Sequence, residues 1–165
     1  MALPAFFSAA PGIVLRDPLA ELLGAAEGGL IEYGYADAVR LAGHSCPTVA
    51  GAYLMARAAL RALYPDAVPE RGSVVVTMSM AEEEGTTGVI AQVFTLLTGA
   101  AGNNGFHGIG GHHARHGLLR YGSNDLSCIA GFCRSDTGDT VYVSMDLSSV
   151  SPAPQMRVLM GRALA

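Results

Sequence analysis

The chain has 165 residues, which suits one domain of ordinary size. Half of the residues are hydrophobic and only 15% are charged, so a packed core is expected rather than a disordered chain. The net charge of −4 argues against nucleic-acid binding. All ten basic residues are arginine, and the absence of lysine excludes Schiff-base enzymes and P-loop nucleotide hydrolases.

Features of targeting and secretion are missing from the sequence. The N-terminal residues have no basic segment typical of a signal peptide, and no apolar run approaches the roughly 20 residues of a membrane-spanning helix. Three cysteines, an odd number, form no obvious disulfide framework. We therefore expect a soluble cytoplasmic protein that does not bind membranes. Its apolar, weakly charged composition favours a homodimer.

The first two expected helices lie in the N-terminal quarter of the chain. Residues 1–30 are interpreted as a helical extension, in which Asp17 and Pro18 open a short helix. A second helix is expected at residues 35–42, ending at Gly43. It would begin a core domain that covers residues 31–150.

A third helix and a first strand form the centre of the predicted core. Pro47 suits the first position of a helix, which makes Cys46 its N-cap, and apolar residues then recur at helical spacing up to Tyr64. Alternating apolar residues at 73–80 predict a strand. A further helix is expected to end near Thr98.

The second half of the chain combines a glycine-rich loop with short strands. Seven glycines lie within residues 99–117, which we interpret as a loop. Strands are expected near 118–121, 126–134 and 140–147, and residues 151–165 form an amphipathic helical tail. Hairpin signals between these strands indicate antiparallel pairing. The predicted fold is α+β, with N-terminal helices packed on an antiparallel sheet of about four strands.

The sharpest candidate for chemistry is the pair His44 and Cys46 at the start of the third helix. A cysteine at a helix N-cap is favoured as thiolate by the unpaired N–H groups and the helix dipole. A thiolate and an imidazole are ligands that zinc prefers, although a structural zinc site needs four and a catalytic site three. The alternative is a buried capping cysteine beside a surface histidine.

Residues 42–47, which read Ala-Gly-His-Ser-Cys-Pro, resemble the G-H-x-C-P signature of the FmdE family, whose name comes from a component of formylmethanofuran dehydrogenase. A looser similarity covers residues 88–92 and 97–99, and the resemblance spans about 33–147. It implies an α+β core, an intertwined homodimer and a metal centre of the zinc type held partly by the motif histidine and cysteine. The chain departs from the family at Ala42, Thr86 and Ala100, where relatives carry a histidine and two cysteines, and it lacks a C-x-x-C ribbon.

Further ligands could come from the glycine-rich loop. It contains four of the five histidines of the chain, which are His107, His112, His113 and His116. His112 and His113 follow a Gly pair and are the candidates for completing a metal site with His44 and Cys46. His107 and Arg115 are candidates for substrate binding. The alternative is a mobile surface loop.

Acidic residues 82–84 follow the predicted strand and precede the next helix. Glu83 and Glu84 are candidates for a general base, and a solvated acidic helix start is the alternative interpretation.

Three hypotheses for function remain open at this point. The first is a zinc-type or other transition-metal enzyme in which Arg115 or Arg120 holds an anionic group of a small-molecule ligand. The second is a haem-binding or sensor protein with Cys46 or a loop histidine as axial ligand. The third is an accessory subunit of a one-carbon or molybdenum/tungsten enzyme. The sequence names no substrate or reaction.

Overall fold

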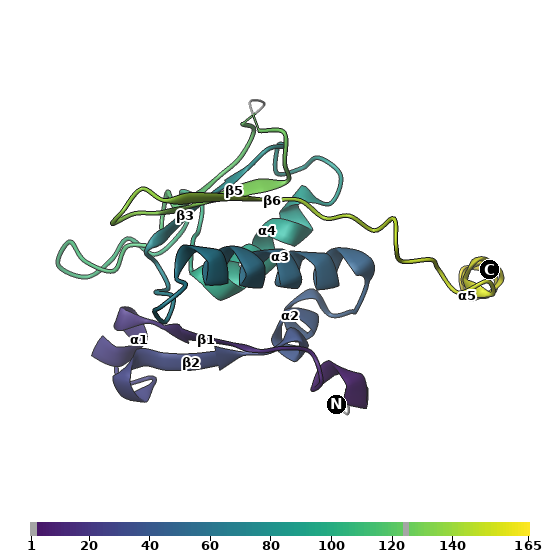
Figure 1. The fold of residues 1–165 in the computed structure, drawn as a ribbon, viewed down its shortest axis with the longest axis horizontal. Helices are drawn as coiled ribbons and strands as arrows, with labels where there is room; N and C mark the ends of the chain where they lie inside the picture. The colour runs from purple at the N-terminus through teal and green to yellow at the C-terminus, as the bar shows by residue number, and fades with distance from the viewer. Residues whose placement is uncertain (1–2, 124–125) are drawn as a thin grey trace.

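The computed structural model describes residues 3–123 and 126–165 and has an α+β fold built in layers. A four-stranded sheet lies on one side of helices α3 (Pro47–Leu63) and α4 (Thr87–Thr98), as Figure 1 shows. A β-hairpin and helix α2 (Tyr35–Ala42) lie on the other side of α3. The core forms where these layers meet, and its largest fully buried side chains include Tyr53, Phe94 and Phe132.

The main sheet confirms the predicted class but is mixed rather than antiparallel. Its order is β4 (Leu119–Arg120), β3 (Val74–Met78), β5 (Ala130–Arg134) and β6 (Thr140–Val143). Strands β3, β5 and β6 pair antiparallel as predicted, whereas β4 runs parallel to β3. The wholly antiparallel prediction was wrong because α4 and the glycine-rich loop carry the chain back across the sheet before β4 begins, and parallel pairing needs such a crossover.

The N-terminal segment is not the helical extension that we expected. Strand β1 (Ile13–Arg16) pairs antiparallel with β2 (Leu30–Tyr33), and helix α1 (Pro18–Leu22) is short. Ile13 and Leu15 of β1 are buried in the core, while the residues between and after them are exposed. A strand of four residues gives too weak an alternation to detect in sequence. The predicted boundary between residues 30 and 31 falls inside β2 and separates most of that strand from its partner β1.

The two helices that flank the His-Ser-Cys motif have the predicted bounds. Helix α2 ends at Gly43, which adopts the left-handed conformation with φ of 77°. Helix α3 begins at Pro47 with Cys46 as its N-cap. Glycine tolerates positive φ without steric cost, and proline suits a position whose N–H would have no helical partner. Local backbone preferences therefore place the motif in a short turn between two helices.

A buried ionic cluster ties the glycine-rich loop to the N-terminal hairpin. The carboxylate of Asp17 accepts hydrogen bonds from the N–H groups of Leu19 and Ala20 at the start of α1. It also accepts from the guanidinium groups of Arg71 and Arg115, each at 2.6 Å. Because Asp17 and Arg115 are both almost fully buried, this contact joins segments 98 residues apart with little competition from water.

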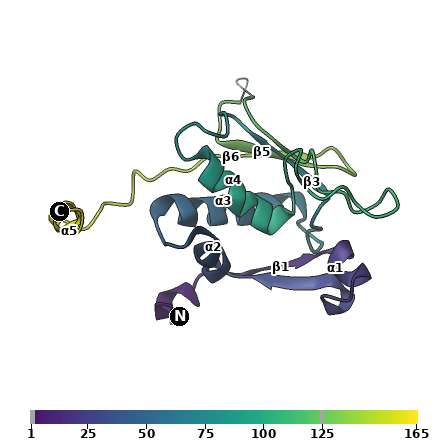
Figure 2. The same cartoon turned by 180° about the vertical axis from the view of Figure 1, so that it is seen from behind.

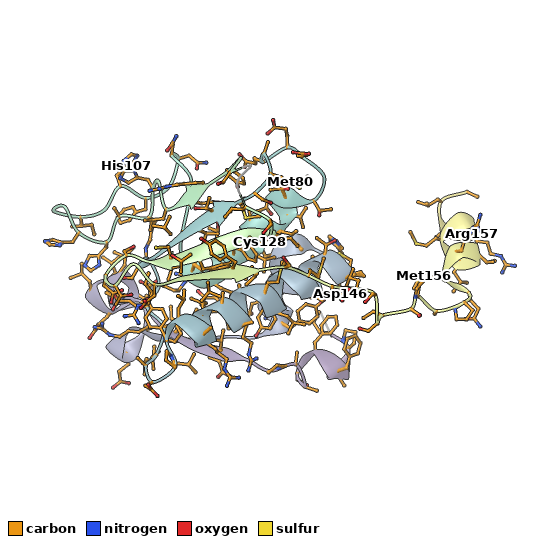
Figure 3. All side chains as sticks on the ribbon, turned by 45° about the horizontal axis from the view of Figure 1, so that its top comes forward. Met80, His107, Cys128, Asp146, Met156 and Arg157 are labelled. Atoms are coloured by element: carbon orange, nitrogen blue, oxygen red, sulfur yellow. The ribbon has the colours of Figure 1, made fainter. Side chains whose placement is uncertain are left out.

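The C-terminal segment extends away from the rest of the molecule. Helix α5 (Met156–Ala163) confirms the predicted helical tail, and all residues from 146 to 165 are exposed. Figure 3 shows Met156 and Arg157 on this isolated helix, with Asp146 near the start of the connecting arm. No helix in the described part of the chain is long and apolar enough to cross a membrane.

Candidate functional site

The turn between α2 and α3 presents His44 and Cys46 at one end of the molecule. It is anchored by a hydrogen bond of 2.7 Å between the hydroxyls of Ser45 and Tyr35. The Tyr35 ring packs edge-on against Phe7, with ring centroids 5.1 Å apart. The turn is therefore held by core contacts on one side while its histidine is exposed to solvent on the other.

The imidazole of His44 is oriented by its own backbone. Its Nδ1 lies 3.0 Å from the carbonyl oxygen of Ala42. Since a carbonyl only accepts, Nδ1 is the protonated donor, and Nε2 is left available for a ligand or a proton. The Ala42 carbonyl raises the pKa of His44 above its ordinary value, and the Cys46 sulfur raises it further.

The thiol of Cys46 is tuned toward its thiolate. Partial burial would raise its pKa, but the backbone N–H groups of Val49 and Thr48 and the imidazole of His44 outweigh that cost and lower it. The sulfur makes no capping hydrogen bond of standard geometry, so these N–H groups act mainly through their charge distribution at the helix start. His44 and Cys46 thus favour each other's charged form, as a thiolate and an imidazolium.

The other predicted ligands lie elsewhere. The glycine-rich loop is found beyond the C-terminal end of α3 in Figures 1 and 2, whereas His44 and Cys46 precede its N-terminal end. A helix of 17 residues is about 25 Å long. Among residues 3–123 and 126–165, no group of three or more His, Cys, Asp or Glu side chains could hold a metal ion. One chain therefore does not combine His112 and His113 with His44 and Cys46.

The loop histidines contact each other instead. The rings of His107 and His116 stack with centroids 4.4 Å apart, and those of His112 and His113 are tilted at 6.3 Å. Ile109 and His112 exchange two backbone hydrogen bonds of 2.9 Å around a Gly-Gly pair in which both glycines have positive φ. The glycines thus form a tight hairpin turn, which is the reason for their place in the sequence.

The remaining candidates differ in exposure. Glu83 and Glu84 are exposed in the segment before α4, and His107 is exposed in the loop, so their catalytic and substrate-binding roles stay predictions. Arg115 was expected to bind substrate, but it is only 7% exposed and its guanidinium pairs with Asp17. Its position is that of a structural tether, which the spacing of the loop residues did not indicate.

The sequence reasoning missed a cleft beside α4. A cavity of about 970 Å³ lies between α4, β4 and residues 101–105, and it includes Arg120 and Tyr121. Its lining residues come from segments that are far apart in the chain, and no motif marks them. Only the assignment of Arg120 as an anion-binding candidate pointed toward this region.

Comparison with known proteins assigns no family. No protein-family model, curated protein or solved structure matches this chain. The resemblance to the FmdE family therefore stays a prediction from the sequence motifs.

Proposed function

We propose that this protein is an FmdE-like metal-binding protein, in which His44 and Cys46 bind a zinc-type ion that a second copy of the chain helps to coordinate. The observation that supports this most is the paired thiolate and imidazolium at an exposed helix start, where a metal ion would displace the proton from Nε2 of His44. A two-fold axis through the ion would supply the same pair twice and complete a Cys₂His₂ shell. That arrangement needs no ligand from the glycine-rich loop.

The C-terminal arm supports a homodimer. An isolated helix of eight residues is marginal in water, so α5 requires a surface that covers it. Its exposed apolar side chains include Val158, Leu159 and Met160. Residues 151–165 carry two arginines and no acidic residue, in a chain whose net charge is −4. Reciprocal exchange of arms between two copies would bury both apolar faces against oppositely charged bodies.

Metal analysis tests the site directly. We expect about one zinc ion per two chains, and loss of the metal in both Cys46→Ala and His44→Ala. Cys128→Ala is the matched control, because Cys128 is also a half-buried free cysteine but lies far along the chain from the motif. Unchanged metal in Cys46→Ala, or a wild-type protein that takes up no zinc on reconstitution, would overturn the proposal. A Soret band in the visible spectrum would do so in favour of haem.

The dimer is tested by mass measurement in solution. The full chain should have the mass of two copies in size-exclusion chromatography with light scattering. Removal of residues 151–165 should shift it toward the monomer. A monomeric full chain at the concentrations used for metal analysis would contradict the shared site. One zinc ion per chain in a monomer would instead require a third ligand from within the chain.

A further inference from the structure

The cleft beside α4 is separate from the metal-binding turn and does not depend on it. Its volume of about 970 Å³ is in the range of small-molecule sites. One wall is a single face of α4, where Thr95 and Leu96 lie three and four residues after Gln92. The opposite wall comes from β4 and Tyr121, and residues 101–105 close one side. Figure 2 shows α4 in front of α3.

Arg120 is the cationic group of the cleft that has free hydrogen-bonding capacity. Its Nε donates to the carbonyl of Gly117 at 3.3 Å, which holds the side chain in place. In the part of the chain that the structure describes, its two terminal nitrogens have no carboxylate partner, unlike those of Arg71, which pairs with Asp17. A guanidinium whose outer edge is free matches the two oxygens of a carboxylate or the oxygens of a phosphate.

The other lining groups define what else a ligand would need. Gln92, Asn103 and Asn104 bring amide groups to the cleft, which can donate to oxygen atoms. Leu41, Leu96 and Leu119 provide apolar surface.

Among the described residues that line the cleft, Glu82 is the one carboxylate, and its charge opposes the binding of an anion. Glu82 lies toward the hydroxyl of Tyr121, and the pKa of Tyr121 is raised first by burial and then by this carboxylate. Arg71 also lines the cleft, but its charge is paired with Asp17, so Arg120 is the guanidinium that faces a ligand together with the neutral amides.

We propose that this cleft binds a small organic anion, a carboxylate or phosphate ester attached to an apolar body, with Arg120 as its main anionic contact. The apolar part would lie against the leucine side chains and the amides would hold the remaining oxygens. The site is distinct from the proposed metal-binding turn because its lining includes neither His44 nor Cys46, although Leu41 of α2 lines one edge of it.

Nuclear magnetic resonance titration of the full, isotopically labelled chain tests this. The probes are sodium benzoate, phenyl phosphate and the neutral benzyl alcohol. We expect saturable shifts of the side-chain amides of Gln92, Asn103 and Asn104 with the anions, and none with the alcohol. The stronger of the two anions identifies the head group. Arg120→Gln should weaken anion binding about tenfold or more, since hydrogen bonds to charged groups dominate such contacts.

Two further variants make the result decisive. Arg61→Gln removes an exposed arginine of α3 that lies outside the cleft, and binding should stay as in wild type. Asn104→Ala keeps the charge and should weaken binding less than Arg120→Gln. The proposal fails if neither anion gives saturable shifts at the cleft. It also fails if benzyl alcohol binds equally well, or if Arg61→Gln has the same effect as Arg120→Gln.

Discussion

Replacing Asp17 by Asn removes the charge at the centre of the buried ionic cluster and leaves the shape almost unchanged. Asparagine caps helices as well as aspartate does, so the hydrogen bonds to the start of α1 should survive. The substitution affects Arg71 and Arg115, which both lose their anionic partner. The side chain of Arg115 is only 9% exposed and that of Arg71 17%, so water cannot replace the carboxylate fully.

The expected loss in the free energy of unfolding follows from this burial. Removing one partner of a buried ion pair costs about 3–5 kcal/mol, because an uncompensated charge remains. We expect Asp17→Asn to lower the free energy of unfolding by about that amount, out of about 5–15 kcal/mol for a domain. Asp136→Asn is the matched control. Asp136 also pairs with an arginine at 2.6 Å, but its side chain is 57% exposed and screened by water, so a much smaller loss is expected.

Urea unfolding followed by circular dichroism measures both variants. If Asp17→Asn costs no more than Asp136→Asn, the cluster does not stabilise the fold in the way described. The pH dependence gives a second check. Burial would raise the pKa of Asp17, but Arg71, Arg115 and the N–H of Ala20 lower it below its ordinary value.

The sign of this effect is fixed by the lowered pKa. The unfolded chain binds a proton at Asp17 near pH 3.9, and the folded chain does so only at lower pH. The stabilisation by Asp17 is therefore complete above that value and lost as the pH falls through the folded pKa. The difference in stability between wild type and Asp17→Asn should be constant near neutral pH and shrink below about pH 4. A difference that grows on acidification would refute this assignment.

Two substitutions test packing at single positions. Gly72→Ala places a Cβ against the Arg115 guanidinium, at a residue whose φ is 85°. It should lower the free energy of unfolding by more than the about 1–2 kcal/mol expected from backbone strain alone. Gly85→Ala is the control for strain, because its φ is 58° and the space around it is open. If both variants lose the same stability in urea unfolding, the contact with Arg115 is excluded. Tyr53→Phe removes a buried hydroxyl that bonds two backbone carbonyls, the nearer at 2.8 Å, and should lower stability by about 1–2 kcal/mol. Unfolding indistinguishable from wild type would show that these carbonyls find other donors.

The parts of the fold that sequence reasoning predicted are those with strong local signals. A glycine at a helix end, a proline at a helix start and apolar residues at helical spacing specified the bounds of α2 and α3, and with them the position of Cys46 at the N-cap. The lowered pKa of its thiol follows from that position and from the neighbouring imidazole. The clustering of the loop histidines in the sequence was a poorer guide to the metal site. Their backbone turns back on itself at Gly110 and Gly111.

The amino-acid sequence by itself determined the class of fold, the helix that begins after the His-Ser-Cys motif and the helical tail. These depend on interactions between residues a few positions apart. Only the tertiary structure decided that β4 runs parallel to β3, that β1 joins the core and that Arg115 is buried against Asp17. It also formed the cleft beside α4. Each of these joins segments distant in the chain, and such contacts depend on which surfaces bury each other rather than on local backbone preference.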